Sequence, residues 1–232
     1  MTKILFVCHG NICRSPNAEF YMKELVLKAG LQDEFEIASA ATHREELGNP
    51  VYPPTKALLK KHGIDCSCKR ARLMLKEDYN KFDLLIGMDE ENLIHMERIC
   101  GGDPEKKLHN LLEYAGRPGD SVADPWYTRD FERTWQDVAA GCQGLLETCC
   151  GISSMDFSAC KQRDDFYKIM RAKANWPDTM GDNLDALFQI LLSPQQRSAR
   201  YLLLMPENPS EDVRDYAEKV FEVFDTAGKA IV

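Results

Sequence analysis

The stretch "VCHGNICRSP", residues 7–16, overlaps the end of the apolar run "KILFVC" of residues 3–8. The apolar run predicts a buried strand, and Pro16 stands where a helix accepts a proline in its first turn. Gly10 lets the backbone turn tightly between the two elements. A strand, a tight loop and a helix N-terminus in this order aim backbone N–H groups and the positive end of the helix at one point. The stretch therefore predicts a phosphate-binding loop.

Cys8 and Arg14 give this loop its chemistry. The field that holds a phosphate also favours the thiolate form of a cysteine at the base of the loop, so Cys8 is the candidate nucleophile. The planar fork of Arg14 can bind two phosphate oxygens, and the Ser15 hydroxyl can donate to the thiolate when it departs. The alternative is a cysteine packed at a strand end before an ordinary helix start.

A second Cys-x5-Arg spacing runs from Cys66 to Arg72 in "CSCKRAR". The pattern alone is weak, because nine cysteines and many arginines produce it by chance. This second match contains no glycine and follows no strong strand. We interpret it as accidental.

The segment "DPWY", residues 124–127, offers the proton that a leaving oxygen needs. Asp124 lies on a loop stiffened by proline, where it can protonate the leaving group and then activate water. Trp126 and Tyr127 can form a groove wall that stacks on an aromatic substrate. An Asp-Pro pair by itself is more often a plain turn. Its combination with the Cys8 loop favours the catalytic interpretation.

Strand-like and helix-like segments alternate through the first 150 residues. This alternation predicts an α/β fold with a parallel four-stranded sheet flanked by helices, and ligands at the carboxyl ends of its strands. After the first strand and helix come strands at 35–41, 82–89 and near 106–112, and helices at 54–63, 90–102 and 127–150.

The remaining residues start a new pattern. It contains strands at 155–160 and 201–206, helices at 163–174, 184–192 and 211–228, a turn-rich 175–183 and a terminal 229–232. We expect two domains, residues 1–150 and residues 152–232. The junction "GISSMD" has no long Gly/Ser or Pro tract, which favours domains that pack together.

Composition excludes several classes of protein. The chain has 232 residues and a formal net charge of −8, which argues against a nucleic-acid partner held by bulk charge. No apolar stretch approaches the length of a membrane span, so no membrane partner is expected. Nine scattered cysteines fit a reducing compartment, and we expect a cytoplasmic protein. The histidines show no metal-ligand spacing, and neither a metal nor a cofactor is expected.

The segments "VCHGNICRSPNAE", "SAAT", "GNP", "KKHGI", "RARLMLKEDYNKFDLLIGMDEENL" and "DPWY" are similar, in this order, to the low-molecular-weight protein tyrosine phosphatases. The resemblance covers residues 1 to about 150 and implies the phosphatase type I fold. It implies Cys8 as nucleophile, Arg14 as phosphate clamp and Asp124 as general acid and base. The implied reaction is hydrolysis of a phosphotyrosine protein or a small aryl phosphate through a phosphocysteine intermediate.

The same resemblance implies further roles around the loop. Asn11, Ser15 and Ser39 form the hydrogen-bond network that supports it, and Cys13 is the redox partner of Cys8. Lys69 stands where many members carry a histidine, and Glu45 stands where many carry an aromatic or apolar groove residue. The residues expected to contact substrate are His9, Gly10, Asn11, Ile12, Cys13, Ser15, Glu45, Trp126 and Tyr127.

Two alternative functions remain open at this point. Arsenate reductases share the fold and need relay cysteines downstream, for which Cys66, Cys68 and Cys100 are candidates; the aromatic residues after Asp124 favour the phosphatase. A catalytically degenerate scaffold that acts through protein binding is the other alternative. The intact set of Cys8, Arg14, Ser15 and Asp124 argues against it.

Residues from about 155 to 232 resemble barstar, the intracellular inhibitor of a secreted ribonuclease. The most specific segment is "GDNLDALFQIL", residues 181–191. The resemblance implies a small α/β domain that binds a protein partner. Asn183 and Asp185 retain polar positions of the inhibitory surface, whereas Thr179 replaces an aromatic residue and Gln189 replaces a carboxylate. The two replacements argue against a ribonuclease as that partner.

Overall fold

The computed structural model describes residues 1–174, 176, 181–196, 199–206 and 209–231. The chain forms two compact units. The first contains Met1–Leu27 and Leu31–Leu146, and the second contains Lys28–Gly30 and Glu147–Val232. Across the described ranges, no helix combines the length and the apolar character that crossing a membrane requires.

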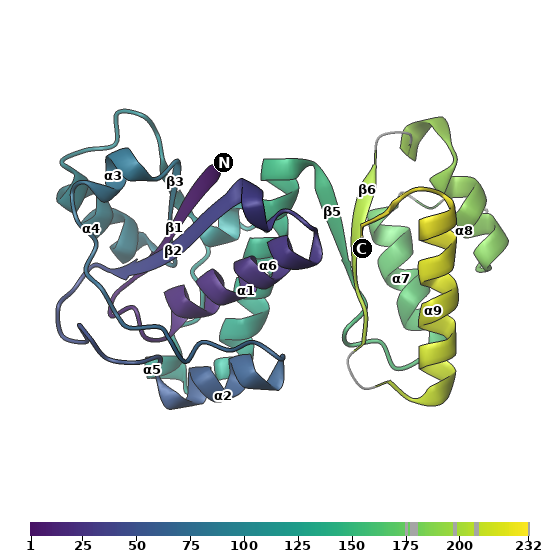
Figure 1. The fold of residues 1–232 in the computed structure, drawn as a ribbon, viewed down its shortest axis with the longest axis horizontal. Helices are drawn as coiled ribbons and strands as arrows, with labels where there is room; N and C mark the ends of the chain where they lie inside the picture. Colours follow the sequence, from purple (N-terminus) through teal and green to yellow (C-terminus); the bar gives the residue numbers. More distant parts are fainter. Residues whose placement is uncertain (175, 177–180, 197–198, 207–208, 232) are drawn as a thin grey trace. The chain divides into compact units, whose positions relative to one another are not determined.

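The first unit is built on a parallel four-stranded sheet with the strand order β2-β1-β3-β4 (Figure 1). The expected parallel sheet is confirmed. Its central strand β1 pairs with β2 on one side, where Cys8 lies opposite Ala41, and with β3 on the other, where Val7 lies opposite Gly87. The strands are β1 (Thr2–Cys8), β2 (Phe35–Ala41), β3 (Leu84–Gly87) and β4 (Leu108–Asn110).

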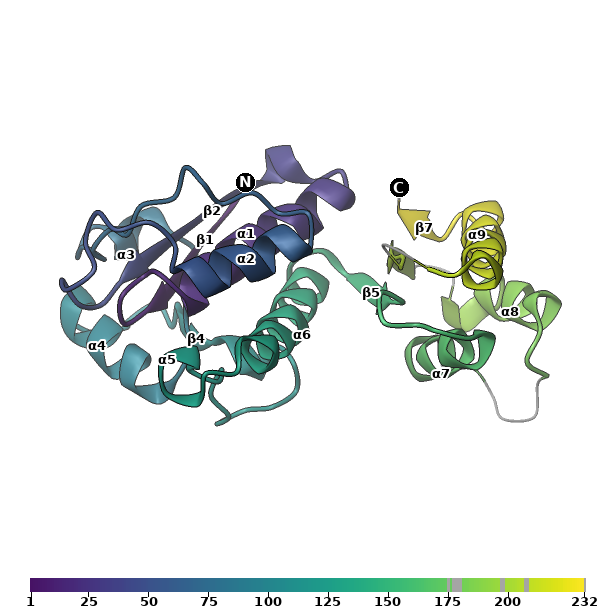
Figure 2. The same ribbon diagram turned by 90° about the horizontal axis from the view of Figure 1, so that it is seen from below.

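Helices cover both faces of this sheet (Figure 2). The helices are α1 (Arg14–Lys28), α2 (Pro53–Lys61), α3 (Asp78–Lys81), α4 (Glu90–Cys100), α5 (Pro125–Thr128) and α6 (Phe131–Cys150). α1 packs on α6, where the Tyr21 and Trp135 rings meet edge to face at 4.9 Å. On the opposite face, Leu5 and Val7 of β1 pack with Met96 of α4. Leu5 and Val7 are two residues apart and share this face, as strand geometry requires.

α6 lies against the segment that follows β4. A Cβ at Gly144 would sit 1.9 Å from the carbonyl oxygen of Tyr114, and one at Gly141 would sit 2.4 Å from Leu111 Cγ. Only glycine permits such a close approach of a helix to a neighbouring backbone. This contact fixes the helix that follows the Asp124 segment.

The expected helix over 127–150 begins later than predicted. Pro125–Thr128 forms the separate short helix α5, and Arg129 has a left-handed φ of 58° that ends it. Asp130 Oδ1 then accepts a hydrogen bond from Arg133 N at 2.8 Å, which caps the start of α6. The break holds Trp126 and Tyr127 apart from the long helix.

The second unit has a parallel three-stranded sheet with the order β5-β6-β7. Buried residues of its three helices pack on Met155, Tyr201 and Leu203 of the sheet. Phe166 lies at the centre of this core, stacked on Phe157 at 4.9 Å. The elements are β5 (Ile152–Asp156), α7 (Arg163–Lys173), α8 (Leu184–Leu191), β6 (Arg200–Leu204), α9 (Glu211–Thr226) and β7 (Ala230–Ile231).

The junction between the two sequence patterns is a strand. The prediction of a strand over 155–160 placed it too late, because β5 spans Ile152–Asp156 and pairs with β6 along its whole length. Two serines weakened the apolar signal of this stretch, yet Ser154 is buried and Ser153 Oγ donates to Glu147 at 2.9 Å. The strand β5 therefore belongs to the sheet of the second unit.

Candidate active site

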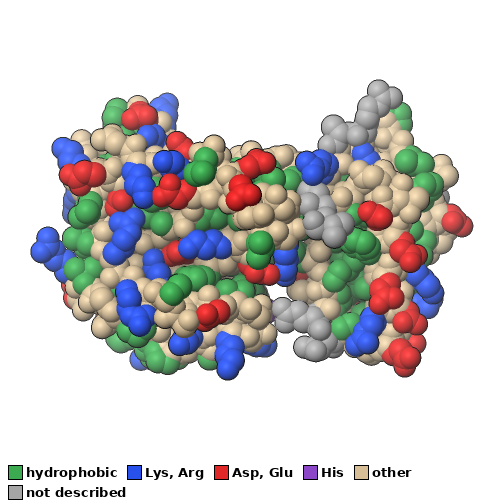
Figure 3. All heavy atoms as spheres, viewed as in Figure 1, with side chains coloured by type: hydrophobic (Ala, Val, Ile, Leu, Met, Phe, Trp, Pro, Cys, Tyr) green, Lys and Arg blue, Asp and Glu red, His purple; other side chains and the backbone are tan. Residues whose placement is uncertain are grey.

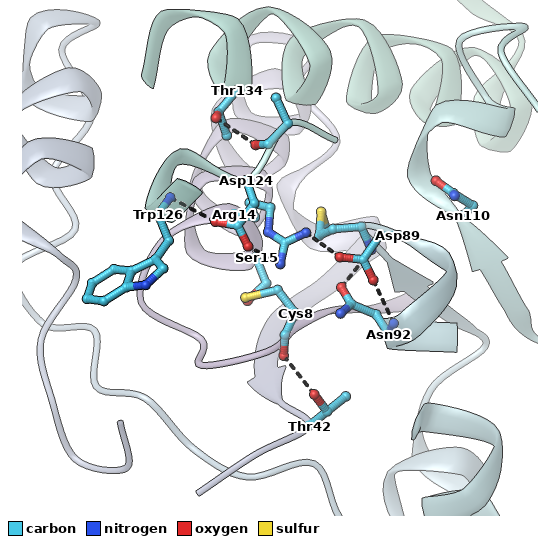
Figure 4. A network of polar contacts seen from close by, with 12 residues as sticks. Cys8, Arg14, Ser15, Thr42, Asp89, Asn92, Asn110, Asp124, Trp126 and Thr134 are labelled. Carbon is cyan, nitrogen blue, oxygen red and sulfur yellow. Dashed lines mark hydrogen bonds and ion pairs between the residues drawn. The ribbon is translucent and has the colours of Figure 1, made fainter. Parts of the chain in front are cut away.

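The loop between β1 and α1 lies at the carboxyl end of the central strand and forms the floor of a cavity of about 650 Å³. Figure 4 shows Cys8, Arg14 and Asp124 turned toward one another in this region. The lining residues are Cys8, His9, Gly10, Ile12, Cys13, Arg14, Glu45, Glu46, Asp89, Glu90, Glu91, Ser121, Val122, Ala123, Asp124, Trp126 and Tyr127. They come from the loops that follow β1, β2, β3 and β4, which is the expected edge of a parallel sheet.

The Cys8 sulfur is surrounded by hydrogen-bonding groups. Ser15 Oγ lies 3.0 Å from Cys8 Sγ, and the backbone N–H of Asn11 points at the same sulfur from 3.3 Å. Asn11 has a left-handed φ of 57°, a conformation that asparagine tolerates better than most residues. This turn aims the Asn11 amide into the loop, so the sequence places the groups that can stabilise a thiolate.

A directed chain of hydrogen bonds supports the loop from behind. Asn11 Nδ2 donates to Ser15 Oγ at 2.9 Å and to Ser39 Oγ at 2.7 Å. Ser39 Oγ donates in turn to Glu19 Oε2 at 2.5 Å. Since Asn11 donates a hydrogen bond to Ser15 Oγ, the Ser15 hydroxyl hydrogen can point at Cys8 Sγ at 3.0 Å or, over a longer distance of 3.5 Å, at the carbonyl of Ala40. The shorter contact is the one to Cys8.

Glu19 anchors this chain as a buried carboxylate. Lys69 Nζ lies 2.7 Å from its Oε2 and Lys23 Nζ lies 2.6 Å from its Oε1. Although burial disfavours its charge, the two lysines lower the pKa of Glu19 below its ordinary value. Lys69 also donates to the carbonyl of Ser39 at 3.1 Å. Lys69 thus supports the loop through Glu19 and Ser39.

Arg14 is held by two carboxylates. Its Nη1 pairs with Asp89 Oδ2, and its Nη2 lies 2.6 Å from Asp124 Oδ2. Burial works against the charge of Arg14, but the negative charges of Cys8, Asp124 and Asp89 raise the pKa of the guanidinium above its ordinary value. Asp89 also caps α4 by accepting from Asn92 N at 2.6 Å. The guanidinium is therefore fixed, charged and directed into the cavity.

Asp124 lies at the start of the short helix α5. Its Oδ1 accepts from Trp126 N at 2.9 Å, and Thr134 Oγ1 donates to the neighbouring carbonyl of Ala123 at 2.8 Å. Trp126 is 52% exposed and Tyr127 is 83% exposed. Two large aromatic side chains left this open in the cavity lining are suited to contact an aromatic ligand.

Most of the predicted site residues come together, in two layers. His9, Gly10, Ile12, Cys13, Glu45, Trp126 and Tyr127 line the cavity with Cys8, Arg14 and Asp124. Asn11, Ser15 and Ser39 are buried behind it. Their side chains contact the loop and Cys8 Sγ, and contact of Asn11 and Ser15 with substrate stays a prediction.

Cys13 and the more distant cysteines differ in position. Burial raises the pKa of the Cys13 thiol to about 12, and Cys13 lines the cavity beside Cys8. Cys66, Cys68 and Cys100 are absent from the described cavity lining, and burial raises the pKa of Cys100 to about 11. The arrangement gives no support to an arsenate-reducing relay.

The accidental Cys66–Arg72 spacing has a structural role. The Arg72 guanidinium pairs with Asp78 at 2.8 Å, and its backbone N–H donates to Asn11 Oδ1 at 3.1 Å. Cys66 is buried in the first unit. The segment supports the phosphate loop through its backbone.

Three histidines that are distant in the sequence contact one another in a row that begins at His9 of the loop after β1. The rings of His9 and His43 stack at 3.9 Å, and His95 meets His43 edge to face at 4.6 Å. Among the residues that the structure describes, no group of three or more His, Cys, Asp or Glu side chains is arranged to hold a metal ion.

Sequence reasoning missed several residues of the site, of which Asp89 and Glu19 make the strongest contacts. Asp89 lies two residues after the end of strand β3 and directly before helix α4, so its position at the sheet edge was a usable signal. Glu19 gave no signal, because one glutamate in an amphipathic helix reads as a solvent-facing residue. It is 5% exposed.

Known proteins share both the sequence and the fold of this unit. The sequence model described as low molecular weight phosphotyrosine protein phosphatase matches residues 3–151. The chain belongs to this family. The low molecular weight protein-tyrosine-phosphatase YfkJ of Bacillus subtilis is 36% identical over 148 residues, or 63% of this chain and 94% of the relative. The human low molecular weight phosphotyrosine protein phosphatase is 36% identical, and the matched region covers 62% of this chain and 93% of the human protein.

Solved structures of the family superpose on the same unit. The crystal structure of YfkJ gives a TM-score of 0.62 at 36% identity, over 64% of this chain and 94% of that one. A low molecular weight protein tyrosine phosphatase of Streptococcus pyogenes gives a TM-score of 0.57 at 41% identity, and the match covers 64% of this chain and 93% of that one.

The barstar (barnase inhibitor) model matches residues 152–231, so the second unit is barstar-like. The side chain of Asn183 caps α8 by accepting from Ala186 N at 2.8 Å. Asp185 and Gln189 follow on α8, four residues apart and both exposed. Thr179, the fourth residue expected on a binding surface, lies outside the described residues.

Proposed function

We propose that the first unit hydrolyses phosphotyrosine or aryl phosphate monoesters through a phosphocysteine intermediate. In the first step the Cys8 thiolate attacks phosphorus, and the bond from phosphorus to the aryl oxygen breaks. Asp124 supplies the proton that the departing oxygen takes up. Arg14 and the loop N–H groups hold the phosphoryl oxygens as their charge shifts.

The second step reverses the roles around Cys8. Asp124, now a carboxylate, takes a proton from a water that attacks the phosphocysteine. The bond from phosphorus to sulfur breaks, inorganic phosphate leaves, and Cys8 departs as a thiolate. The Ser15 hydroxyl donates a hydrogen bond to that sulfur, which makes it a better leaving group.

One arrangement carries this proposal. Ser15 Oγ lies 3.0 Å from Cys8 Sγ at the floor of the cavity in which Asp124 pairs with Arg14. A buried structural cysteine does not need an oriented hydroxyl, a clamped guanidinium and a carboxylate around one cavity. The relatives named as tyrosine phosphatases, each matched over more than nine-tenths of its length, support the same assignment.

The test is turnover of p-nitrophenyl phosphate by the full chain, followed by acid quench to trap a phosphorylated Cys8 peptide. We expect turnover and a labelled Cys8, with more label in Asp124→Asn because the second step is slowed. Reduction of arsenate by the same protein without p-nitrophenyl phosphate turnover would assign the chain to the alternative reaction. If the protein shows neither activity, the scaffold that acts through protein binding is the assignment that remains.

We further propose that residues 1–150 and 152–232 are separate domains, and that the barstar-like domain binds a protein partner. The exposed α8 positions Asp185 and Gln189 are offered as part of its contact surface, with Asn183 beside them and Thr179 preceding them. Limited proteolysis tests the division: cleavage should concentrate near residue 151 and release two resistant fragments. Uniform degradation would contradict it.

A further inference from the structure

The mouth of the Cys8 cavity is acidic. Asp89 and Asp124 pair with Arg14, so their charges are engaged at the floor. The remaining carboxylates of the lining are Glu45, Glu46, Glu90 and Glu91. Among the described lining residues, Arg14 is the sole Lys or Arg. By contrast, Lys and Arg side chains are interspersed with Asp and Glu over the face seen in Figure 3.

One pair of these glutamates lies directly on the phosphate loop. Glu45 Oε2 is 3.8 Å from Nε2 of His9. Glu46 Cγ lies 3.0 Å from where a Cβ on Gly10 would stand, so the absence of a side chain at Gly10 lets Glu46 close against the loop. Glu46 also accepts from the neutral amide of Asn49 at 2.7 Å, and this partner carries no charge that would offset the carboxylate.

The second pair begins helix α4. Glu90 and Glu91 directly follow Asp89, whose carboxylate holds the Arg14 guanidinium. The strand order β2-β1-β3 places the segment after β2 and the start of α4 on opposite sides of the loop that follows β1. The two pairs of glutamates therefore flank the Cys8 loop from both sides.

One cation outside the lining lies on the aromatic wall. The Arg129 guanidinium lies 5.5 Å from the ring centroid of Trp126 and outside the lining residues. This cation stacks on Trp126, and one charge does not offset four carboxylates on both sides of the loop. The field at the mouth remains negative.

We infer that this site prefers phosphotyrosine in a basic sequence context, with Glu45, Glu46, Glu90 and Glu91 as its specificity-determining residues. The inference rests on the proposed phosphatase function. The phosphate itself is held by Arg14 and the loop N–H groups, so the rim meets the residues next to the phosphotyrosine. Lysine or arginine there is attracted by the rim, while aspartate or glutamate is repelled.

The effect is moderate and depends on salt. Glu45, Glu90 and Glu91 are exposed, so each contributes little by itself and is screened by ions. Four acting together should separate a lysine-flanked from a glutamate-flanked phosphopeptide by about tenfold in kcat/KM at low ionic strength. The ratio should fall to about twofold near 0.5 M salt, where screening is strong.

The experiment uses the full chain and three phosphotyrosine peptides that differ only in flanking Lys, Gln or Glu. The ratio of their kcat/KM values is measured at low and high salt, with p-nitrophenyl phosphate as a measure of catalytic competence. We expect kcat/KM to be highest for the peptide with flanking Lys, intermediate for the one with Gln and lowest for the one with Glu. The quadruple variant Glu45→Gln, Glu46→Gln, Glu90→Gln, Glu91→Gln should bring the ratio near one.

Glu97→Gln is the matched control, because Glu97 is exposed on α4 but outside the cavity lining. The ratio of kcat/KM between the lysine-flanked and glutamate-flanked peptides should be the same for this variant as for the unchanged chain. If the quadruple variant does not fold, the double variants at 45/46 and 90/91 should each reduce the ratio. Equal rates for the three peptides, or faster turnover of the acidic one, would overturn the inference and leave the phosphatase function intact. Absence of p-nitrophenyl phosphate turnover would overturn both.

Discussion

Asp124 Oδ2 lies 2.6 Å from Arg14 Nη2, so the proposed general acid and the proposed phosphate clamp are paired before any phosphate arrives. A phosphoryl group that takes two N–H bonds from the guanidinium competes with that carboxylate. A dianion beside a carboxylate favours proton uptake by the carboxylate. We therefore expect substrate binding to displace Asp124 from Arg14, which frees its carboxyl group to act on the leaving oxygen.

The first prediction concerns this released carboxyl group. Asp124→Asn should lower kcat/KM, which reports the step that expels the leaving group, by about 10²-fold or more with a basic leaving group such as phenoxide. The loss should be smaller with p-nitrophenoxide, because a good leaving group needs little protonation. Steady-state kinetics with a series of substituted phenyl phosphates measures it. Equal losses across the series would remove Asp124 from the role of acid.

The second prediction separates the two Cys-x5-Arg spacings. Cys8→Ser and Arg14→Ala should each abolish turnover of p-nitrophenyl phosphate, since one removes the nucleophile and the other the clamp. Cys66→Ser and Arg72→Ala are the matched controls. Arg72 supports Asn11 through its backbone N–H, which alanine retains, so turnover should persist. Loss of activity in the controls alone would reverse the assignment.

The third prediction is a redox one. Peroxide should oxidise the Cys8 thiolate to a sulfenic acid, and the Cys13 sulfur should then displace water to form a disulfide that a thiol reduces. Because the pKa of Cys13 is raised to about 12, its thiolate fraction and the rate of this second step should increase from pH 7 to 9. Mass spectrometry follows both species. A sulfonic acid on Cys8 with Cys13 still free would reject the idea.

Much of the fold follows from local pattern. The strand, loop and helix around Cys8 were predictable because apolar period, glycine and proline all agree there. The break between α5 and α6 was not, because it depends on one left-handed residue, Arg129, inside an otherwise helical pattern. The prediction placed strand β5 too late, because Ser153 and Ser154 owe their extended form to pairing with β6.

The site was predictable where the chemistry is local and not where it depends on tertiary contact. Ser15 lies in the first turn of α1 directly after the loop, so its contribution could be read from the sequence, and the resemblance to the phosphatases implied that of Asn11. Glu19 and Glu46 are ordinary glutamates until the fold brings one under Ser39 and the other against Gly10. Their functional environment is created by elements distant in the sequence.

The fourth prediction tests Glu19 as a buried anchor. Its pKa is lowered in the folded state by Lys69 and Lys23, so its contribution to stability is present above its ordinary pKa and is lost as pH falls through the lowered value. Lys69→Met should reduce the free energy of unfolding at pH 7 by about 2 kcal/mol. The difference from the unchanged chain should shrink as Glu19 becomes protonated in acid.

Lys61→Met is the matched control for this measurement. Lys61 Nζ lies 3.4 Å from Glu132 Oε2, and both side chains are more than half exposed, so removal of this surface pair should change stability little. Denaturant unfolding at pH 7 and in acid compares the three proteins. If Lys69→Met lowers the free energy of unfolding by as much in acid as at pH 7, the effect comes from lost packing and not from the ion pair.

The fifth prediction concerns the barstar-like unit. The resemblance implies that such a surface inhibits its ribonuclease by placing an acidic helix in a strongly cationic active site. Gln189 stands at the position of a carboxylate on α8, where it is exposed. An amide can accept hydrogen bonds but carries no charge against a cluster of arginines and lysines. Cations buried without a partner cost several kcal/mol, or about three powers of ten in affinity.

We therefore predict that the full chain binds a barnase-like ribonuclease weakly or not at all, and that Gln189→Asp recovers part of the binding. Asp185 lies one helical turn before Gln189 and is exposed, so the restored carboxylate would act beside a charge already present on the same face. Thr179→Tyr, which returns an aromatic contact, should add to the recovery. Calorimetric titration of the ribonuclease with the unchanged chain and both variants measures the affinities. Nanomolar binding by the unchanged chain would contradict the prediction, because it would show that the interface does not need the missing charge.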